Sequence, residues 1–212
     1  SASSYAVLGA SRHGGDTVPA WSSNPGVALV APDGSTPGTD SIRIFVPDGQ
    51  TFASFTVIGV DSQVATPIIY AAANGFNQGS ATAAVVQPVV ELYGVNASQT
   101  AAGADDPFYA YIGVPYAGTQ TLWSAESRAA GKPALSVTFT SSNAAVGTLV
   151  TTVLTSATVN AAIGAGAYYS PTTVAGGGAA FRPLTAGSTT VSAAIPGFLQ
   201  TVNAAGVLVT VQ

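Results

Sequence analysis

The residues able to carry out acid–base chemistry are few and scattered along this chain of 212 residues, which has one His and no Cys. A Ser-His-Asp relay would have to use His13. Arg12, Gly14 and Gly15 place that histidine in an expected loop, and no Gly-x-Ser-x-Gly turn accompanies it. We therefore expect His13 to be an exposed loop residue, and we expect the protein not to be an enzyme.

Carboxylates could instead supply oxygen ligands for Ca²⁺. Asp105 and Asp106 are adjacent, and Asp33, Asp40 and Asp48 lie in turns rich in Gly and Pro. Asp beside Gly or Pro is also a preferred turn residue, and no Asp-x-Asp-x-Asp-Gly loop is present. We therefore expect turn formation from these residues, with no bound metal and no cofactor.

Glycosidase and phosphate-binding signatures are incomplete. Glu91 and Glu126 lie on an expected strand and an expected loop with no implied partner, so they predict no carboxylate pair. The Gly176–Gly178 run lacks the Lys and the following helix of a phosphate loop. It is more typical of a flexible connection between strands.

The aromatic residues are compatible with carbohydrate binding. Trp21, Trp123, Tyr168 and Tyr169 could stack on sugar rings, or they could fill a core or a subunit contact. Asn96 begins an Asn-Ala-Ser sequon and is a possible glycosylation site.

Composition narrows the class of protein. Apolar residues make up 47% of the chain and charged residues 7%, which is the reverse of a disordered chain. No apolar run is long enough for a spanning helix, and a net charge of −4 argues against nucleic acid. So little charge is a poor surface for solubility, and polar side chains, sugar or neighbouring molecules would have to cover it. A chain rich in Ala, Gly, Thr and Val with almost no Lys is typical of exported surface or fibrous proteins, so we expect an extracellular location.

The hydrophobic pattern predicts an all-β fold. Short alternating runs recur between clusters of Gly, Pro, Asn and Asp, as in sandwiches and barrels. In the second half we expect about eight strands, a number that suits an immunoglobulin-like sandwich. They cover residues 89–95, 108–114, 134–140, 146–153, 157–163, 168–174, 189–194 and 207–211.

Four matches in the same order indicate an internal duplication. The matched positions lie 104, 119, 117 and 122 residues apart, and such drift is typical of loop insertions. We therefore expect two tandem immunoglobulin-like β-sandwiches, over residues 1–87 and 88–212. The matched pairs are Tyr5–Gly9 with Tyr109–Gly113, Ser22–Val27 with Ser141–Val146, Val46–Phe52 with Ile163–Tyr169, and Gly75-Phe76 with Gly197-Phe198.

The first copy lacks one strand. Nothing before Tyr5–Gly9 matches Val89–Val95, which precedes the equivalent strand of the second copy. A sandwich short of a strand exposes unpaired backbone groups and an apolar slot, which a strand from another subunit could fill. The alternative is a sandwich with fewer strands or a trimmed sequence. The residues that we expect at subunit contacts are Tyr5, Val7, Leu8, Val207, Val209 and Val211.

Several motifs in residues 134–212 resemble the tandem bacterial immunoglobulin-like (Big-type) repeats of large secreted surface proteins. They are Thr140–Asn143, Ser170–Gly177, Ala180–Ala193 and Ile195–Phe198; residues 17–87 match more loosely. The resemblance implies an immunoglobulin-like fold and a role as stalk, adhesin module or filament subunit.

From this pattern we expect a structural subunit or segment of an extracellular filament or cell-surface fibre. It would assemble with copies of itself, as a homopolymer, by strand pairing or strand donation. The alternatives are a carbohydrate-binding adhesin module, with Trp21, Trp123 or Tyr168 on an exposed platform, and a viral or phage surface protein.

Overall fold

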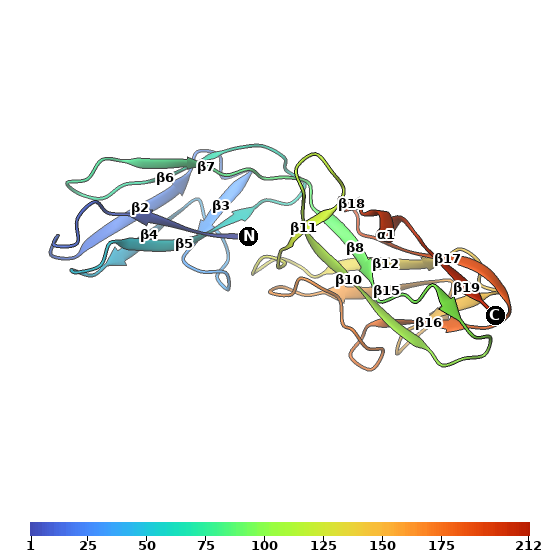
Figure 1. Ribbon diagram of the computed structural model, residues 1–212. Helices are drawn as coiled ribbons and strands as arrows, with labels where there is room; N and C mark the ends of the chain where they lie inside the picture. Colours follow the sequence, from blue (N-terminus) through green and yellow to red (C-terminus); the bar gives the residue numbers. More distant parts are fainter. The chain divides into compact units, whose positions relative to one another are not determined.

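The computed structural model describes all 212 residues, and the expected all-β fold is confirmed. The chain divides into two compact units, which we call unit 1 and unit 2 (Figure 1). Unit 1 comprises residues 1–86 and 129–132, and unit 2 comprises residues 87–128 and 133–212. The one helix, α1 (Val202–Ala205), has four residues, and no helix is long and apolar enough to cross a membrane.

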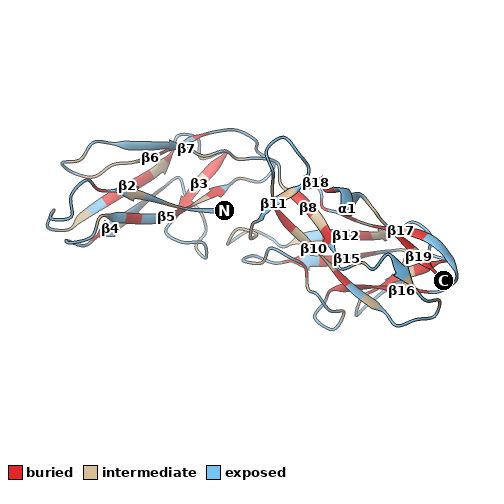
Figure 2. Cartoon of the chain, in the orientation of Figure 1, coloured by how far each residue is buried: buried red, intermediate tan, exposed pale blue.

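Unit 1 consists of two antiparallel sheets with strand orders β1-β5-β3 and β4-β2-β6-β7. Val30 and Phe55 of the first sheet belong to the same buried cluster as Ala20 and Ile69 of the second, so the sheets pack face to face (Figure 2). The strands are β1 (Ala2–Val7), β2 (Asp16–Ser22), β3 (Ala28–Ala31), β4 (Ser41–Val46), β5 (Phe52–Gly59), β6 (Ile68–Ala71) and β7 (Gly79–Thr82).

Unit 2 has two larger sheets, with strand orders β14-β13-β16-β10-β8-β18 and β15-β12-β17-β19-β9. Its first-sheet strands are β8 (Val89–Tyr93), β10 (Asp106–Pro115), β11 (Leu122–Ala125, beside β10), β13 (Gly147–Val150), β14 (Thr155–Ser156), β16 (Ala179–Pro183) and β18 (Leu199–Gln200). Its second-sheet strands are β9 (Ser98–Gln99), β12 (Leu135–Ser141), β15 (Thr158–Ile163), β17 (Gly187–Ala194) and β19 (Val207–Val211).

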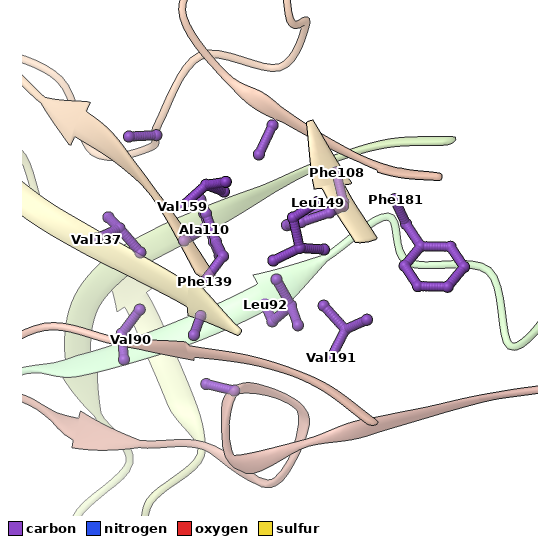
Figure 3. Close-up of a cluster of buried hydrophobic side chains, with 14 of the residues drawn as sticks. Val90, Leu92, Phe108, Ala110, Val137, Phe139, Leu149, Val159, Phe181 and Val191 are labelled. Carbon is purple, nitrogen blue, oxygen red and sulfur yellow. The ribbon is translucent and has the colours of Figure 1, made fainter. Parts of the chain in front are cut away.

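Large aromatic side chains fill the core of unit 2 (Figure 3). Phe108 of β10 meets Phe139 of β12 edge to face, with ring centroids 5.0 Å apart. Phe181 of β16 is also fully buried. Edge-to-face contacts of this kind add to the stabilisation from burial alone, and here they join the two sheets.

The strand pairs of unit 1 recur in unit 2. All of these pairs are antiparallel. In one sheet, β2–β4, β2–β6 and β6–β7 of unit 1 correspond to β12–β15, β12–β17 and β17–β19 of unit 2. In the other sheet, β3–β5 and β1–β5 correspond to β13–β16 and β10–β16. The registers of β2 with β4 and with β6 follow the offsets of the sequence matches, whereas the register of β1 with β5 combines the matched offset of 104 with one of 124. In unit 1, Asp16 lies opposite Val46, Ser22 opposite Ile69, and Ala2 opposite Val57. The corresponding pairs of unit 2 are Leu135 with Ile163, Ser141 with Val191, and Asp106 with Phe181.

The Ser-Ser-Asn segments at the ends of β2 and β12 make equivalent hydrogen bonds. Ser23 Oγ accepts a hydrogen bond from the Ile68 N–H at 2.9 Å, and Ser142 Oγ accepts one from the Thr190 N–H at the same distance. Each bond ties the end of one strand to the next strand of its sheet. These serines therefore satisfy backbone donors where the regular ladder ends.

One expected strand is absent, and the elements that were not expected include the core strand β16 and helix α1. Residues 168–174 form no strand: Tyr169 makes a single bridge to Tyr111, after which Pro171, which has no N–H, and a glycine-containing turn end the pairing. Helix α1 was not expected before β19. Thr201 caps it, because its hydroxyl accepts a hydrogen bond from the Ala204 N–H.

Candidate binding surfaces

Strand β1 has one paired edge and one open edge. It pairs with β5 alone, whereas β10, its counterpart in unit 2, pairs with β16 on one side and β8 on the other. Strand β8 also contributes Val90 and Leu92, which are 0% and 2% exposed, to the core of unit 2 (Figure 3). Unit 1 has no strand at that position.

A groove of about 720 Å³ lies in unit 1 between the open edge of β1 and strands β6 and β7. Its walls carry small side chains, including Ala6, Ala71 and Ala83, and Phe55 and Ile69 line it as well. We call this feature the edge groove. A space lined in this way leaves apolar surface uncovered within unit 1.

The open edge of β1 presents backbone donors. The Leu8 N–H points toward β5, because it donates to the Thr51 carbonyl at 2.8 Å. Successive N–H groups of a strand point to opposite sides. The N–H groups of Tyr5 and Val7 therefore point toward the open edge.

The residues expected at subunit contacts differ in how far their side chains are exposed. Tyr5 and Val7 are exposed, at 65% and 58% of their surface. Leu8, Val209 and Val211 are buried in the cores of their own units, and Val207 is half-buried against the core of unit 2. The side chains of Leu8, Val209 and Val211 are thus committed within the folded units, because their strands turn them inward.

Five tyrosines form a continuous surface cluster in unit 2, which we call the tyrosine face. Tyr93 lies on β8, Tyr109 and Tyr111 on β10, and Tyr168 and Tyr169 on the segment that follows β15. Their ring centroids are 4.8–6.2 Å apart, and the Tyr111 and Tyr168 rings are stacked at 12°. A hydrogen bond with Tyr111 is the main cause that raises the pKa of Tyr109 above its ordinary value of 10.0.

Strand register brings these rings together. Tyr93 lies directly opposite Tyr109, and Tyr111 lies opposite Tyr169. The Tyr168–Ser170 segment is fixed to β10 by Ser170, which is 0% exposed and whose hydroxyl accepts a hydrogen bond from the Ala110 N–H at 3.0 Å. The aromatic side chains are therefore held by sheet backbone on both sides.

Polar groups lie at one end of the tyrosine face. Glu91 of β8 is directly opposite Tyr111 in the ladder. Its Oε1 atom accepts a hydrogen bond from Asn203 Nδ2 of α1 at 3.0 Å. A carboxylate thus lies across the ladder from Tyr111, and an amide is hydrogen-bonded to that carboxylate.

Sequence reasoning singled out Tyr168 and Tyr169 but not the other three tyrosines. The available signal was the spacing of Tyr109 and Tyr111, because residues two apart in a strand share one face. Tyr93 could not be added without the register between β8 and β10.

His13 is half-buried and tied to its own loop. Its Nε2 lies 3.0 Å from the Gln50 carbonyl oxygen, and its ring meets Phe76 edge to face at 6.2 Å. A carbonyl oxygen only accepts, so Nε2 is the donor of this hydrogen bond. These contacts connect the loop of His13 to Gln50 and Phe76.

Four of the five aspartates considered as oxygen ligands, Asp33, Asp48, Asp105 and Asp106, accept hydrogen bonds within the chain. The Asp105 carboxylate receives two hydrogen bonds of 2.7 Å from Arg182, and these lower its pKa below the ordinary 3.8. Asp106 instead accepts hydrogen bonds from Asn96 and Gln99. Hydrogen bonds from Ser35 and Thr36 lower the pKa of Asp33 and close a turn, and Asp48 accepts a bond from the Gly14 N–H. No group of three or more acidic or histidine side chains lies close enough together to hold a metal ion.

The remaining candidates are spread over both units. Trp21 stacks on Tyr70 at 5.5 Å across β2 and β6. Trp123 is 68% exposed and contacts Tyr116 at 5.1 Å. The sequon residue Asn96 is exposed and donates its side-chain N–H to Asp106 at 2.7 Å.

No protein-family model matches this chain, and no curated protein matches it.

Proposed function

We propose that this protein is a structural segment of an extracellular filament or cell-surface fibre, built from two copies of one immunoglobulin-like module. We further propose that the edge groove of unit 1 accepts a β-strand from a neighbouring copy of the chain. The observation that carries this proposal is the open edge of β1 beside an apolar groove, at the place where unit 2 holds β8.

The shared registers support the duplication. Equivalent strand pairs keep the same direction in both units, and the pairs of β2 keep the matched residue offsets. Two unrelated sandwiches would have no reason to share register, because register depends on the individual hydrophobic pattern and the turn geometry. The low charge, 7% of residues, supports a surface that neighbouring molecules cover.

The pairing of β8 with β10 supplies the expected register of the donated strand. Leu92 lies opposite Ala110 and Val90 opposite Ile112. By the same offset, the incoming strand would run antiparallel to β1 and place apolar side chains opposite Ala6 and Leu8. Its backbone would pair with the open N–H groups of Tyr5 and Val7.

The free energy gained from burying one strand is comparable to the cost of association, so a short free peptide would bind weakly. Burying three side chains like Val89, Val90 and Leu92 contributes about 5–9 kcal/mol at ~1.5–3 kcal/mol each. The cost of association is about 4–15 kcal/mol. We therefore expect weak binding of an isolated strand and firm assembly only where a neighbouring molecule makes further contacts.

The test substitutes one backbone donor on the open edge. Val7→Pro removes an N–H that points away from β5, so the β1–β5 ladder keeps its hydrogen bonds. We expect this variant to lose assembly in sedimentation velocity and in negative-stain microscopy. The matched control, Val7→Thr, keeps the N–H and a β-branched side chain, and should assemble like the wild type.

Two results would contradict the proposal. One is wild-type protein that remains strictly monomeric at high concentration. The other is a Val7→Pro variant that assembles normally while circular dichroism shows the same fold and melting temperature as the wild type.

A further inference from the structure

The tyrosine face is a feature that the fold does not require. The residues of β1 that correspond to Tyr109 and Tyr111 are Tyr5 and Val7, and the only ring contact of Tyr5 is with Phe52 at 5.6 Å. Unit 1 therefore forms the β1–β5 pair, the counterpart of β10–β16, without an aromatic cluster. Packing alone does not explain why five of the eight tyrosines of the chain gather on one face of unit 2.

The exposure of the rings suits a ligand rather than a core. Tyr93, Tyr168 and Tyr169 are 57%, 40% and 39% exposed, and Tyr109 and Tyr111 are half-buried. Each ring combines an apolar face with a hydroxyl that makes hydrogen bonds. Such a surface remains hydrated without a ligand, and it offers both stacking and hydrogen bonding to one.

From this arrangement we propose that the tyrosine face binds a neutral carbohydrate chain. A pyranose ring has apolar C–H faces and a rim of hydroxyls, so it can stack on a tyrosine while its rim meets polar side chains. The Glu91 carboxylate, opposite Tyr111 in the ladder, and the Asn203 amide, whose Nδ2 lies 3.0 Å from Glu91 Oε1, supply an acceptor and a donor for that rim. Aromatic surface with a few well-placed polar groups is the usual composition of a small-ligand site.

Charge selects a neutral sugar. Glu91 is the one charged side chain among the residues that we assign to the site. A negative group at the polar end repels uronic acids and sulfated sugars, because like charges at short distance disfavour binding. The site lies entirely within unit 2, so the proposal does not depend on strand exchange at unit 1.

Pre-organisation favours binding at this face. The buried Ser170 hydroxyl holds the Tyr168–Tyr169 segment against β10, and the Tyr111 and Tyr168 rings are already parallel. A ligand therefore meets rings whose positions are fixed by the sheet, and little side-chain entropy is lost on binding.

Isothermal titration of the full chain with laminarin, xylan and galactomannan, and with alginate as the acidic comparison, tests the proposal. We expect at least one neutral polysaccharide to bind and alginate to bind more weakly or not at all. Tyr111→Ala should lower the affinity about tenfold or more, as removal of a central aromatic contact commonly does. Tyr111→Phe keeps the ring and should stay within about threefold, and Glu91→Gln should lose several-fold, because charged acceptors make the stronger hydrogen bonds.

Tyr5→Ala is the matched control, because it removes an exposed tyrosine of unit 1 and should leave the affinity unchanged. Melting curves of each variant separate lost binding from lost folding. The proposal fails if no neutral polysaccharide binds the wild type, if alginate binds best, or if Tyr5→Ala weakens binding as much as Tyr111→Ala. A Tyr111→Ala variant that loses assembly, in a chain that binds no sugar, would show that the face is a protein contact instead.

Discussion

Gly147 and Phe181 form a size-matched pair in the core of unit 2. A Cβ atom at Gly147 would collide with the Phe181 ring. The corresponding residues of unit 1, by register, are Ala28 and Val57. A larger residue on one strand is thus accompanied by a smaller one on the next, which keeps the packing density of the interior.

This pairing predicts a steep cost for one added methyl group. Gly147→Ala should lower the free energy of unfolding of unit 2 by about 1–3 kcal/mol, because overpacking forces the phenyl ring out of place. Urea unfolding followed by circular dichroism measures the change. Gly164→Ala is the control, since nothing lies within 4 Å of its added Cβ, and equal effects of the two variants would contradict the steric explanation.

At the level of elements, the buried Thr189 hydroxyl connects three strands. Its Oγ1 accepts a hydrogen bond from the Asn143 N–H at 2.9 Å and lies 2.9 Å from Ser141 Oγ, which donates to the Gly147 carbonyl at 2.7 Å. Thr189 lies on β17, Ser141 is the last residue of β12, and Gly147 is the first residue of β13. The link therefore spans both sheets of unit 2.

Thr189→Val should lower the free energy of unfolding of unit 2 by about 1–3 kcal/mol, because the Asn143 N–H loses its acceptor and Ser141 Oγ loses one of its two partners, while the side-chain shape is kept. Thr140→Val, on a half-buried position of β12, is the control and should cost less than about 0.5 kcal/mol. Chemical denaturation of the two variants beside the wild type makes the comparison. A Thr189→Val protein as stable as the control would mean that the hydroxyl network contributes nothing net.

For the whole molecule, the two units differ in what their cores contain. The largest fully buried side chains are Phe108, Phe139, Phe181, Leu92, Leu149 and Ile163, all in unit 2. In unit 1 the fully buried residues of this class are valines, such as Val18, Val30 and Val46. Less apolar burial, together with an open groove, predicts a lower stability for unit 1 than for unit 2.

Unfolding should therefore occur in two steps, with unit 1 first. Each unit contains one of the two tryptophans, Trp21 or Trp123, so Trp123→Phe leaves a reporter for unit 1 and Trp21→Phe leaves one for unit 2. Tryptophan fluorescence should then show the earlier midpoint in urea for the Trp123→Phe protein. Coincident midpoints, or an earlier transition of unit 2, would contradict the difference in core stability.

The strand-rich character of the chain could be predicted without coordinates, because alternation of apolar and polar residues is a local property. The sequence also carried the offsets, such as 119 between Ser22 and Ser141, that the registers of β2 later followed. Its local errors fell where geometry overrode pattern. The expected strand at residues 168–174 is a loop with one bridge at Tyr169, and neither β16 nor α1 was expected.

Only the tertiary structure decided which side chains meet and which are covered. Tyr5, Val7, Leu8 and Val209 are all large residues that we expected at subunit contacts. Leu8 and Val209 are buried, whereas Tyr5 and Val7 are exposed. Tyr93, Tyr111 and Tyr169 are far apart in the chain and meet only because β8, β10 and the Tyr168–Ser170 segment lie side by side. The reason is physical: a residue's neighbours across a sheet depend on which strands pair and in what register, and those choices depend on the energy of the whole core.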